Sequence, residues 1–542
     1  MREKLFIFLL ILGFGILATR LFVLQVVQGA YWRELSEGNR IKTIKISALR
    51  GVVYDRNGEQ LVRNTPEGRE YIYGQVLAHV LGYVGEISGE ELDEAGQANP
   101  AIVYQQGDLV GKEGIEREYD SYLRGQDGGE IEEVDSNGEK VRVLGKVEPV
   151  EGQNLTLSID LALQEKVFEA LEGKKGAVVI SNPENGEILA LVSSPSYDSN
   201  ILTAGVEGAK KAKNTEGEIK EILNNEDQPM FNRAVSGLYP PGSTFKIVSA
   251  LGALQEDKIT VETEVEDKGV LKVGRWEFGN WYFNQYGRTD GMVDIVKAIK
   301  RSNDIFFYKV GQWLGIDKLS YWARKFGYGR ISGIDLPGEE AGLVPDKEWK
   351  REYKDEDWYL GDDFITAIGQ GDLLATPLQV NMMTASVANN GKLCKPNVVQ
   401  SPKFKAQKKC EDLGIKKEYI ELVKEGMEGA CQSAGETGDT GGTGWPLFEF
   451  KVKNKELEID DKNYLPPTAS DSADIRRIPV ACKTGTAESP GEESKPHAWF
   501  TLYVPVKDPQ MVLTILLEKG GEGSSDAGPI AKEILKWWYE RI

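Results

Sequence analysis

The chain has 542 residues and a formal net charge of −20, from 65 Lys and Arg against 85 Asp and Glu residues. This length is enough for several domains and a large hydrophobic core. The negative charge argues against nucleic acid as a partner, because a phosphate-binding surface needs basic side chains. Only two histidines and four cysteines occur, without an H-E-x-x-H or C-x-x-C motif. The sequence therefore predicts no metal and no other cofactor.

An apolar segment begins after Lys4 and continues to Val27, with a single charge at Arg20. Its length is close to the roughly 20 residues that span a bilayer. A cleaved signal peptide is the alternative, but no convincing A-x-A cleavage site follows. We expect residues 1–29 to be a cytoplasmic tip and an uncleaved anchor, with the basic N-terminus inside. The remaining chain would lie outside the inner (cytoplasmic) membrane, where disulfides are permitted.

Short β-like runs follow this anchor. The stretch "RGVVYDRNGEQLVRN" (50–64) alternates apolar residues around an Asp-Arg-Asn-Gly turn. The stretch "EVDSNGEKVRVLGKVEPV" (133–150) has the same character, and both predict hairpins. We therefore expect residues 30–152 to form an extended, mostly β stalk.

The pattern changes near residue 153. The stretch "LALQEKVFEAL" (161–171) has helical periodicity, and "GAVVISNPENGEILALVSSP" (176–195) is typical of a hairpin. Near the end, "HAWFTLYVPVKDPQMVLTILLEKG" (497–520) predicts two antiparallel strands before a final helix. Helices between two groups of strands indicate an α+β domain, 153–542, with helices packed on an antiparallel sheet.

Residues 432–477 differ from the rest of this domain. They are rich in Gly, Ser, Thr, Asp and Lys and have few apolar runs. This composition predicts a long surface loop.

The stretch "YPPGSTFKIVSA" (239–250) places Ser243 and Lys246 three residues apart, where a helix is expected to begin. Residues at this spacing share one helix face, so the amine would lie beside the hydroxyl. An N-cap serine and a solvated lysine are the ordinary interpretation. Spacing alone favours it, because such a pair is expected by chance about once in a chain of this length.

Two further motifs change this assessment. "RSNDIFFYKVG" supplies Ser302 and Asp304, and "VACKTGTAES" supplies Lys483, Thr484, Gly485 and Thr486. S-x-x-K, S-x-[ND] and K-T-G are the three motifs of penicillin-binding proteins and serine β-lactamases. Each is weak alone, but their order makes coincidence improbable.

The resemblance extends over nearly the whole chain. "GKEGIEREYDSYLRGQDG", "NRAVSGLYPPGSTFKI" and "IGQGDLLATPLQVNMMTASVANNGKL" also resemble class B penicillin-binding proteins of the elongation type. These are monofunctional peptidoglycan D,D-transpeptidases. The resemblance implies a transmembrane helix, a β pedestal and a transpeptidase domain of the serine β-lactamase type, which acts in cell-wall synthesis and cell-shape maintenance.

The resemblance also implies roles for the motif residues. Ser243 would attack a stem peptide that ends in D-alanyl-D-alanine and form an acyl-enzyme. Lys246 would be the base, with its pKa lowered by desolvation and by the Lys483 cation. Ser302 would pass a proton to the leaving amine. Asp304 would hold Lys246 in position while raising its pKa.

The K-T-G strand would bind the substrate. The hydroxyls of Thr484 and Thr486 would take its terminal carboxylate, and Gly485 would let its backbone lie close. The N–H groups of Ser243 and Thr486 would hold the oxyanion. An amine of a neighbouring stem peptide would resolve the acyl-enzyme, whereas β-lactams would stop at the acyl stage.

Because this protein class lacks a glycan polymerase, the resemblance also implies partners. These are a polymerase of the SEDS type, such as RodA, together with the elongation machinery and the membrane.

One departure from the family pattern concerns the stalk: the long segment that follows the first stalk motif in the family is absent after Asn64.

A second departure is Cys482, which stands where the family usually has glycine before K-T-G. We expect this thiol to be reduced and buried, because its side chain would point opposite to Lys483. Any disulfide would then come from Cys394, Cys410 and Cys431. A bond between Cys394 and Cys410 is favoured, because these two flank one short segment.

Two other functions remain as alternatives. In a D,D-carboxypeptidase or β-lactamase-like hydrolase, water would resolve the acyl-enzyme, but the stalk motifs favour a transpeptidase. In a β-lactam sensor or non-catalytic scaffold, no turnover would follow, but the complete set of motifs argues against this. Both histidines, His79 and His497, are expected to be structural.

Overall fold

The chain folds as two compact units in the computed structural model. The first contains Met1–Val52 and Ser121–Asn154, and the second contains Val53–Asp120 and Leu155–Ile542. The stalk expected over residues 30–152 is thus divided between the two units. The structure describes residues 2–66, 68–98, 104–135, 137–203, 215–400, 410–434, 440–454, 456, 463–465, 468, 471–489 and 495–541.

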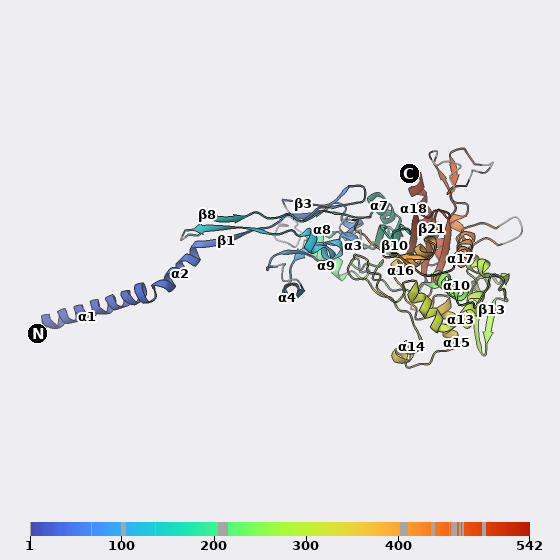
Figure 1. Cartoon of the computed structure of the whole chain (residues 1–542), viewed down its shortest axis with the longest axis horizontal. Helices are drawn as coiled ribbons and strands as arrows, with labels where there is room; N and C mark the ends of the chain where they lie inside the picture. The colour runs from blue at the N-terminus through green and yellow to red at the C-terminus, as the bar shows by residue number, and fades with distance from the viewer. Residues whose placement is uncertain are drawn as a thin grey trace. The chain divides into compact units, whose positions relative to one another are not determined.

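The first unit begins with helix α1 (Arg2–Phe22), which continues through a π-helical turn to Val27. Within the described residues, this is the one helix that is long and apolar enough to cross a membrane, with a mean hydropathy of 2.5 and no burial. Helix α2 (Gly29–Arg40) and a three-stranded antiparallel sheet in the order β1-β7-β8 follow (Figure 1). Its strands are β1 (Ile41–Ile46), β7 (Gly128–Val134) and β8 (Lys140–Val147), and the hairpin expected at 133–150 is confirmed.

In the second unit, a small sheet has the order β4-β3-β2-β9. The expected hairpin of β2 and β3 is confirmed, because the two strands pair in antiparallel fashion. Asp55 fixes its turn, since the carboxylate accepts the backbone N–H groups of Asn57 and Glu59. The strands are β2 (Val53–Tyr54), β3 (Gln60–Thr65), β4 (Gly68–Tyr71) and β9 (Leu155–Thr156).

The main sheet has five antiparallel strands in the order β11-β10-β22-β21-β20. Both hairpins expected from the sequence are present. Its strands are β10 (Gly176–Ser181), β11 (Ile188–Ser194), β20 (Ala481–Ala487), β21 (His497–Val504) and β22 (Met511–Leu517). The K-T-G tripeptide lies in β20, the strand at one edge of the sheet.

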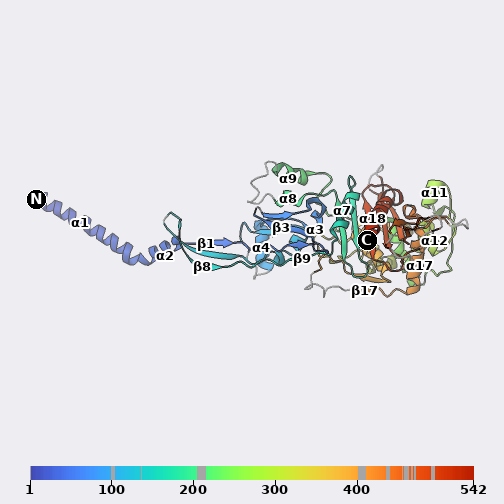
Figure 2. The same ribbon diagram turned by 90° about the horizontal axis from the view of Figure 1, so that it is seen from above.

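Helices cover both faces of this sheet, as expected for an α+β domain. Helices α7 (Leu161–Ala170) and α18 (Gly528–Arg541) contact each other and bury one face in the main hydrophobic core (Figure 2). Helix α16 (Pro377–Ala388) covers the other face, where Asn381 Nδ2 donates to the Val179 carbonyl oxygen. A capping box at Thr376 and a proline at the first position begin α16.

Three helices near the middle of the chain converge beside β20. They are α10 (Lys246–Gln255), α12 (Ile295–Arg301) and α13 (Asp304–Lys325). The Asp294 side chain caps α12, and the Asn303 side chain caps α13 by accepting the Phe306 N–H. Only Ser302 and Asn303 therefore separate the end of one helix from the start of the next.

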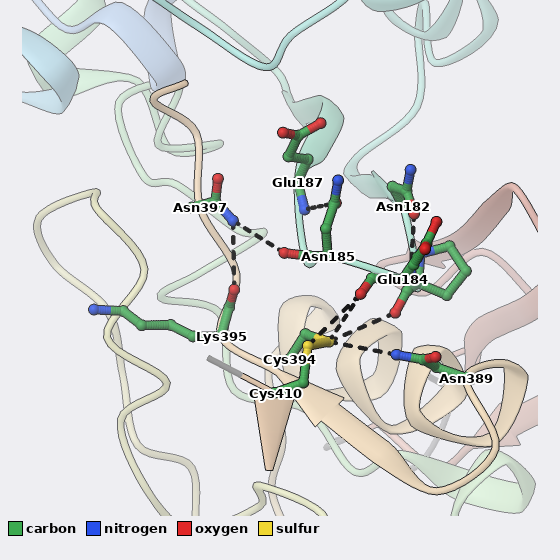
Figure 3. The surroundings of a disulfide bond; sticks show 10 residues. Asn182, Glu184, Asn185, Glu187, Asn389, Cys394, Lys395, Asn397 and Cys410 are labelled. Carbon is green, nitrogen blue, oxygen red and sulfur yellow. Dashed lines mark hydrogen bonds between the residues drawn. A yellow bond between two sulfur atoms is a disulfide. The ribbon is translucent and has the colours of Figure 1, made fainter. Parts of the chain in front are cut away.

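Two disulfides are present in the described part of the chain. The expected bond between Cys394 and Cys410 is confirmed, because these residues lie opposite each other in β16 (Lys392–Cys394) and β17 (Cys410–Asp412). Figure 3 shows it beside the 182–187 turn, where the Cys394 sulfur lies 3.5 Å from the Glu184 carbonyl oxygen.

The expectation of a reduced Cys482 is wrong, because it forms a disulfide with Cys431. Its side chain is buried in the main core, as expected. Helix α17 (Lys417–Ala430) packs against β20 and ends directly before Cys431, which brings the two Cα atoms to 5.9 Å. The 51-residue separation concealed this proximity from the sequence.

The expectation of a surface loop over 432–477 is also wrong for much of its described part. Strands β18 (Lys451–Lys453) and β19 (Ile475–Arg477) pair there, and Leu447, Phe450 and Val452 are buried in the main core. Their stretch, "WPLFEFKVK" (445–453), is short and lies among polar residues, so the composition of the whole segment concealed it. The remainder (435–439, 455, 457–462, 466–467 and 469–470) lies outside the described residues.

His79 predicts an acid-sensitive contribution to stability. It is buried, its Nε2–H donates to the Pro229 carbonyl oxygen at 2.8 Å, and burial lowers its pKa from 6.5 to about 4. Between pH 6.5 and pH 4, His79 is therefore protonated in the unfolded chain but neutral in the native state. Its contribution to the free energy of unfolding is complete above pH 6.5 and is lost as the pH falls toward 4.

For wild-type protein, this group should lower the free energy of unfolding by about 2 kcal/mol between pH 7 and pH 5. His79→Gln keeps a hydrogen-bond donor but cannot titrate, so it should lack that part of the decrease. Urea unfolding at both pH values measures the difference. An equal decrease in the two proteins would show that His79 titrates normally.

Candidate active site

Ser243 lies in a single 3₁₀ turn, η3 (Gly242–Phe245), which leads directly into α10. It is half-buried, whereas its neighbours on both sides are buried, and it lines a cleft of about 740 Å³. The turn is held tightly: the Gly242 N–H donates to the Gly369 carbonyl oxygen at 2.8 Å. Gly242 has φ +54°, and a Cβ there would lie 2.9 Å from the Thr486 carbonyl oxygen. Only glycine fits this position.

Lys246 is the first residue of α10, and its side chain is completely buried. Its Nζ donates to Asp304 Oδ1 at 2.6 Å and to the Ser302 carbonyl oxygen at 2.8 Å. The Ser302 hydroxyl lies 3.4 Å from the same nitrogen. The amine is therefore fixed by the turn between α12 and α13 and is not a solvated lysine.

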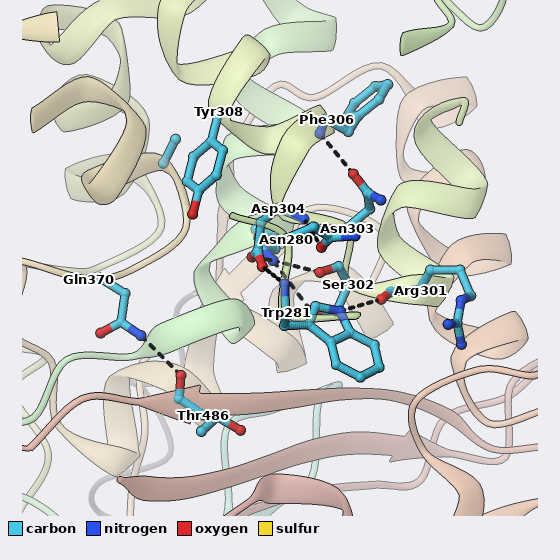
Figure 4. Close-up of polar contacts among 12 residues, drawn as sticks. Asn280, Trp281, Arg301, Ser302, Asn303, Asp304, Phe306, Tyr308, Gln370 and Thr486 are labelled. Atoms are coloured by element: carbon cyan, nitrogen blue, oxygen red, sulfur yellow. Dashed lines mark hydrogen bonds and ion pairs between the residues drawn. The ribbon is translucent and has the colours of Figure 1, made fainter. Parts of the chain in front are cut away.

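The second buried amine comes from the sheet. Lys483 Nζ, on β20, donates to Ser302 Oγ at 2.8 Å and to the Thr484 carbonyl oxygen at 2.9 Å. Ser302 thus lies between the two lysine amines. Its backbone adopts φ 53° and ψ 39°, the left-handed conformation that is uncommon for a residue other than glycine. Figure 4 shows Ser302 and Asp304 at this turn, with Trp281 beside them.

Burial and charge act in opposite directions on these amines. Burial lowers the pKa of Lys246, and the Asp304 carboxylate opposes it through its charge and hydrogen bond. Burial also lowers the pKa of Lys483 well below its ordinary value, and the Lys246 charge adds to this effect. Desolvation, rather than the Lys483 cation, is therefore the leading cause of the lowered Lys246 pKa.

The K-T-G segment forms one wall of the cleft. Thr484 Oγ1 donates to Thr443 Oγ1 at 2.8 Å, whereas the Thr486 side chain is exposed. Gly485 also lines the cleft, but its lack of a side chain has a packing reason: a Cβ there would lie 3.0 Å from Trp499 Cβ and 3.1 Å from Thr244 Cγ2. A side chain at this position would therefore push against Trp499 and the Ser243 turn, so packing favours glycine before any substrate arrives.

Several residues of the site were not selected from the sequence. Asn280 and Trp281 approach Asp304, Thr443 contacts the K-T-G strand, and Gln370 Nε2 donates to the Thr486 carbonyl oxygen at 3.0 Å (Figure 4). Gln370 belongs to the stretch "IGQGD", which resembled the family but suggested no role. Thr443 lies in the segment that was expected to be a surface loop. No local pattern identifies Asn280 or Trp281.

The structure brings together all eight residues proposed from the sequence. Six of them line the cleft, while the amines of Lys246 and Lys483 lie beneath its floor in contact with Ser302. A serine at the surface of a cleft, above two desolvated amines linked by a hydroxyl, is suited to nucleophilic attack and proton transfer. The six that line it are Ser243, Ser302, Asp304, Thr484, Gly485 and Thr486.

The chain matches two family models. Residues 176–536 match the penicillin binding protein transpeptidase domain, and residues 65–157 match the penicillin-binding protein dimerisation domain. The peptidoglycan D,D-transpeptidase MrdA of Haemophilus influenzae is 31% identical, over 97% of this chain and 90% of that protein. MrdA of Escherichia coli is 30% identical, over 96% and 91% respectively.

Solved structures of penicillin-binding proteins also resemble this chain over most of its length. Penicillin-binding protein 2 of Pseudomonas aeruginosa has a TM-score of 0.74 and 32% identity, over 92% of this chain and 96% of that one. Penicillin-binding protein 2 of Helicobacter pylori, in a complex with MreC, also has a TM-score of 0.74, with 28% identity over 92% and 99%. The chain therefore belongs to the class B penicillin-binding proteins, the serine acyltransferases that act as peptidoglycan D,D-transpeptidases in cell-wall synthesis.

Proposed function

We propose that Ser243 is the acylated nucleophile of this transpeptidase and that its donor substrate is a stem peptide ending in D-alanyl-D-alanine. The observation that carries this assignment is the position of Ser243 at the cleft surface, one helical turn before a completely buried lysine. Neutral Lys246 takes the hydroxyl proton as the serine oxygen attacks the carbonyl carbon of the penultimate residue.

The leaving group then needs a proton. Ser302 Oγ lies near both lysine nitrogens, at 3.4 Å from Lys246 and 2.8 Å from Lys483, so it offers a route for this proton. The terminal D-alanine departs with the proton from Ser243 on its amine nitrogen, and an ester joins the peptide to Ser243. An amine of a second stem peptide attacks this ester, and Lys246 accepts its proton. Lys246 then returns this proton to the Ser243 oxygen, so the serine is regenerated, and the new peptide bond is the cross-link.

The edge position of β20 supports the proposed binding mode. Its partner in the sheet lies on one side only, so the substrate backbone can add as a further strand on the other. The exposed Thr486 and the cleft-lining Thr484 present hydroxyls to the substrate carboxylate. The N–H groups of Ser243 and Thr486 stabilise the oxyanion. A β-lactam acylates the same serine but leaves no departing amine, so the ester persists.

The N-terminal helix and the disulfides support a location. Helix α1 and its π-helical turn cross the inner membrane, with the basic N-terminus in the cytoplasm. The catalytic cleft then lies outside, where the two disulfides of the second unit are stable.

A glycan polymerase of the SEDS type supplies the strands that this chain cross-links. The structure of a relative from Helicobacter pylori has been solved in a complex with MreC. A chain in the structure of a peptidoglycan synthase complex is 26% identical over 99% of the length of this chain. Helix α1 presents Gly13, Gly15 and Ala18, small residues that allow close contact with another membrane helix.

Ser243→Ala tests the nucleophile. It should abolish covalent labelling by a fluorescent penicillin, because no hydroxyl remains to form the ester. Its free energy of unfolding should change by about 0.5 kcal/mol or less. Ser489→Ala, which removes a serine from the same cleft, is the matched control and should label normally. Persistent labelling of Ser243→Ala, seen on a denaturing gel, would exclude this residue.

Asp304→Asn tests the electrostatics. The carboxylate raises the pKa of Lys246, so its loss should lower that pKa further. Because the base acts as the neutral amine, the acid limb of acylation rate against pH should move to lower pH. The rate of penicillin acylation across a pH series measures this. Asp317→Asn, an exposed carboxylate, should leave the limb in place, and movement toward higher pH in Asp304→Asn would contradict the assigned base.

Deletion of residues 1–29 tests the polymerase contact. The truncated protein should react with penicillin normally, because the cleft lies wholly in the second unit. It should no longer co-purify with the polymerase from detergent. Co-purification at full yield would show that α1 acts only as a tether.

A further inference from the structure

A buried polar cluster lies next to the second motif, and none of its members lines the cleft. It consists of Asp267, Asn280, Asp290, Arg301 and Asn303, each at most 8% exposed, and we call it the back network. Its members come from separate segments: Asp267 ends β12 (Val265–Asp267), and Asp290 directly precedes β15 (Gly291–Val293). The chemical steps proposed above use none of the five side chains.

Asp267 is the centre of the back network. Its Oδ2 accepts three hydrogen bonds, from Asn280 Nδ2 at 2.8 Å, Asn303 Nδ2 at 2.9 Å and the Asp290 N–H at 3.0 Å. Its Oδ1 accepts the Gly269 N–H at 2.7 Å. The carboxylate thus receives four neutral donors and offers none. Such a site suits a side chain that only accepts hydrogen bonds, as a carboxylate does.

Two links join this centre to the reacting groups. Asn280, held by Asp267, accepts the Asp304 N–H through its Oδ1 at 3.1 Å, and the N–H of the next residue, Trp281, donates to Asp304 Oδ2 at 2.9 Å. The other oxygen of Asp304 receives Lys246 Nζ. The carboxylate of Asp304 therefore has one oxygen for the Trp281 N–H and one for the base. Figure 4 shows Asn280 and Trp281 beside Asp304.

Arg301 forms a second arm of the back network. Its Nε donates to Asp290 Oδ1 at 2.9 Å, and another guanidinium nitrogen donates to the Gly441 carbonyl oxygen at 2.6 Å. The guanidinium carbon also lies 4.6 Å from the centroid of the Tyr282 ring. Gly441 is two residues before Thr443, the residue that contacts Thr484 of the K-T-G strand. One cation thus connects the second motif to the opposite wall of the cleft.

We propose that Asp267 is a positioning residue for acylation, which fixes Asp304 against Lys246 through Asn280 and the Trp281 N–H. Arg301 is a second positioning residue, which places the Gly441–Thr443 segment. This inference rests on the proposed roles of Ser243 and Lys246. It adds to them a control of the base by residues that touch neither the substrate nor the serine.

The isosteric variant Asp267→Asn tests the positioning role, because it changes the hydrogen bonds of this side chain and keeps its size. An asparagine has one oxygen and one NH₂ group, so a donor must face either the Gly269 N–H or the group of three donors. We expect Asn280 and Trp281 to shift as a result, which weakens the contact between Asp304 and Lys246. Glu266→Gln is the matched control, because it neutralises the neighbouring carboxylate, which is exposed.

The full-length protein in detergent is assayed for its rate of acylation by a fluorescent penicillin across a pH series, alongside thermal unfolding. Lys246 faces Asp304 from α13, Lys483 from β20 and Ser302 from the turn between α12 and α13. Weaker contact with Asp304 lowers the pKa of Lys246. Asp267→Asn should therefore acylate at least about tenfold more slowly at its optimum, with the acid limb at lower pH. Glu266→Gln should match wild type.

Arg301→Lys keeps a charge for Asp290 but cannot also reach Gly441, so it should slow acylation and leave the acid limb in place. If Asp267→Asn unfolds below the assay temperature, Asn280→Ser tests the same link while keeping the Asp267 carboxylate and its three other donors, and it should give the same downward movement of the limb. A wild-type pH profile in either variant, or uniform slowing without movement of the limb, would overturn the inference.

Ser243→Ala is assayed in parallel and distinguishes failure of the proposed function from failure of the positioning role. If it still labels, the proposed function fails. If it does not label but Asp267→Asn keeps the wild-type rate and limb, only the positioning role fails.

Discussion

The site depends on two lysine amines that are buried beside a single carboxylate. Removing charged groups from water is costly, and one ion pair between Lys246 and Asp304 cannot neutralise both amines. The consequence is a lowered pKa at Lys246 and a strongly lowered one at Lys483. A lowered pKa increases the fraction of neutral amine at a given pH, and only the neutral amine can act as a base. Desolvation therefore favours the neutral amine that the proposed base requires, which the S-x-x-K spacing alone does not.

This burial places strict demands on the fold. Lys246 must come from a helix and Lys483 from a sheet edge. Ser302 must come from the turn that joins α12 to α13, and Asp304 from the first residue of α13. The short distance between α12 and α13 is possible because Ser302 adopts a left-handed backbone conformation and the Asn303 side chain caps the next helix. The strain of that conformation persists because hydrogen bonds fix the residues on both sides of it.

The strand that carries Lys483 is secured on both faces. On one face, Gly485 packs tightly against the Ser243 turn, where an added Cβ would lie 3.1 Å from Thr244 Cγ2. On the other, Cys482 is bonded to Cys431 at the end of α17, within the main hydrophobic core. An edge strand has hydrogen-bonded support from one neighbour only, so these contacts supply the rigidity that a binding surface requires. The proposed peptide substrate would add along the outer edge of β20, where Gln370 already contacts the Thr486 carbonyl oxygen.

The sequence by itself determined the features that depend on short-range pattern. The apolar segment after Lys4, the hairpins at 50–64 and 176–195 and the three motifs each occupy a few adjacent residues, where periodicity and turn chemistry are visible. The tertiary structure alone decided which distant segments meet. The bond between Cys431 and Cys482, the buried apolar residues near Phe450 and the approach of Asn280 to Asp304 all join segments that are remote in the chain. Burial and hydrogen bonding in such contacts depend on three-dimensional proximity, which no local spacing of residues encodes.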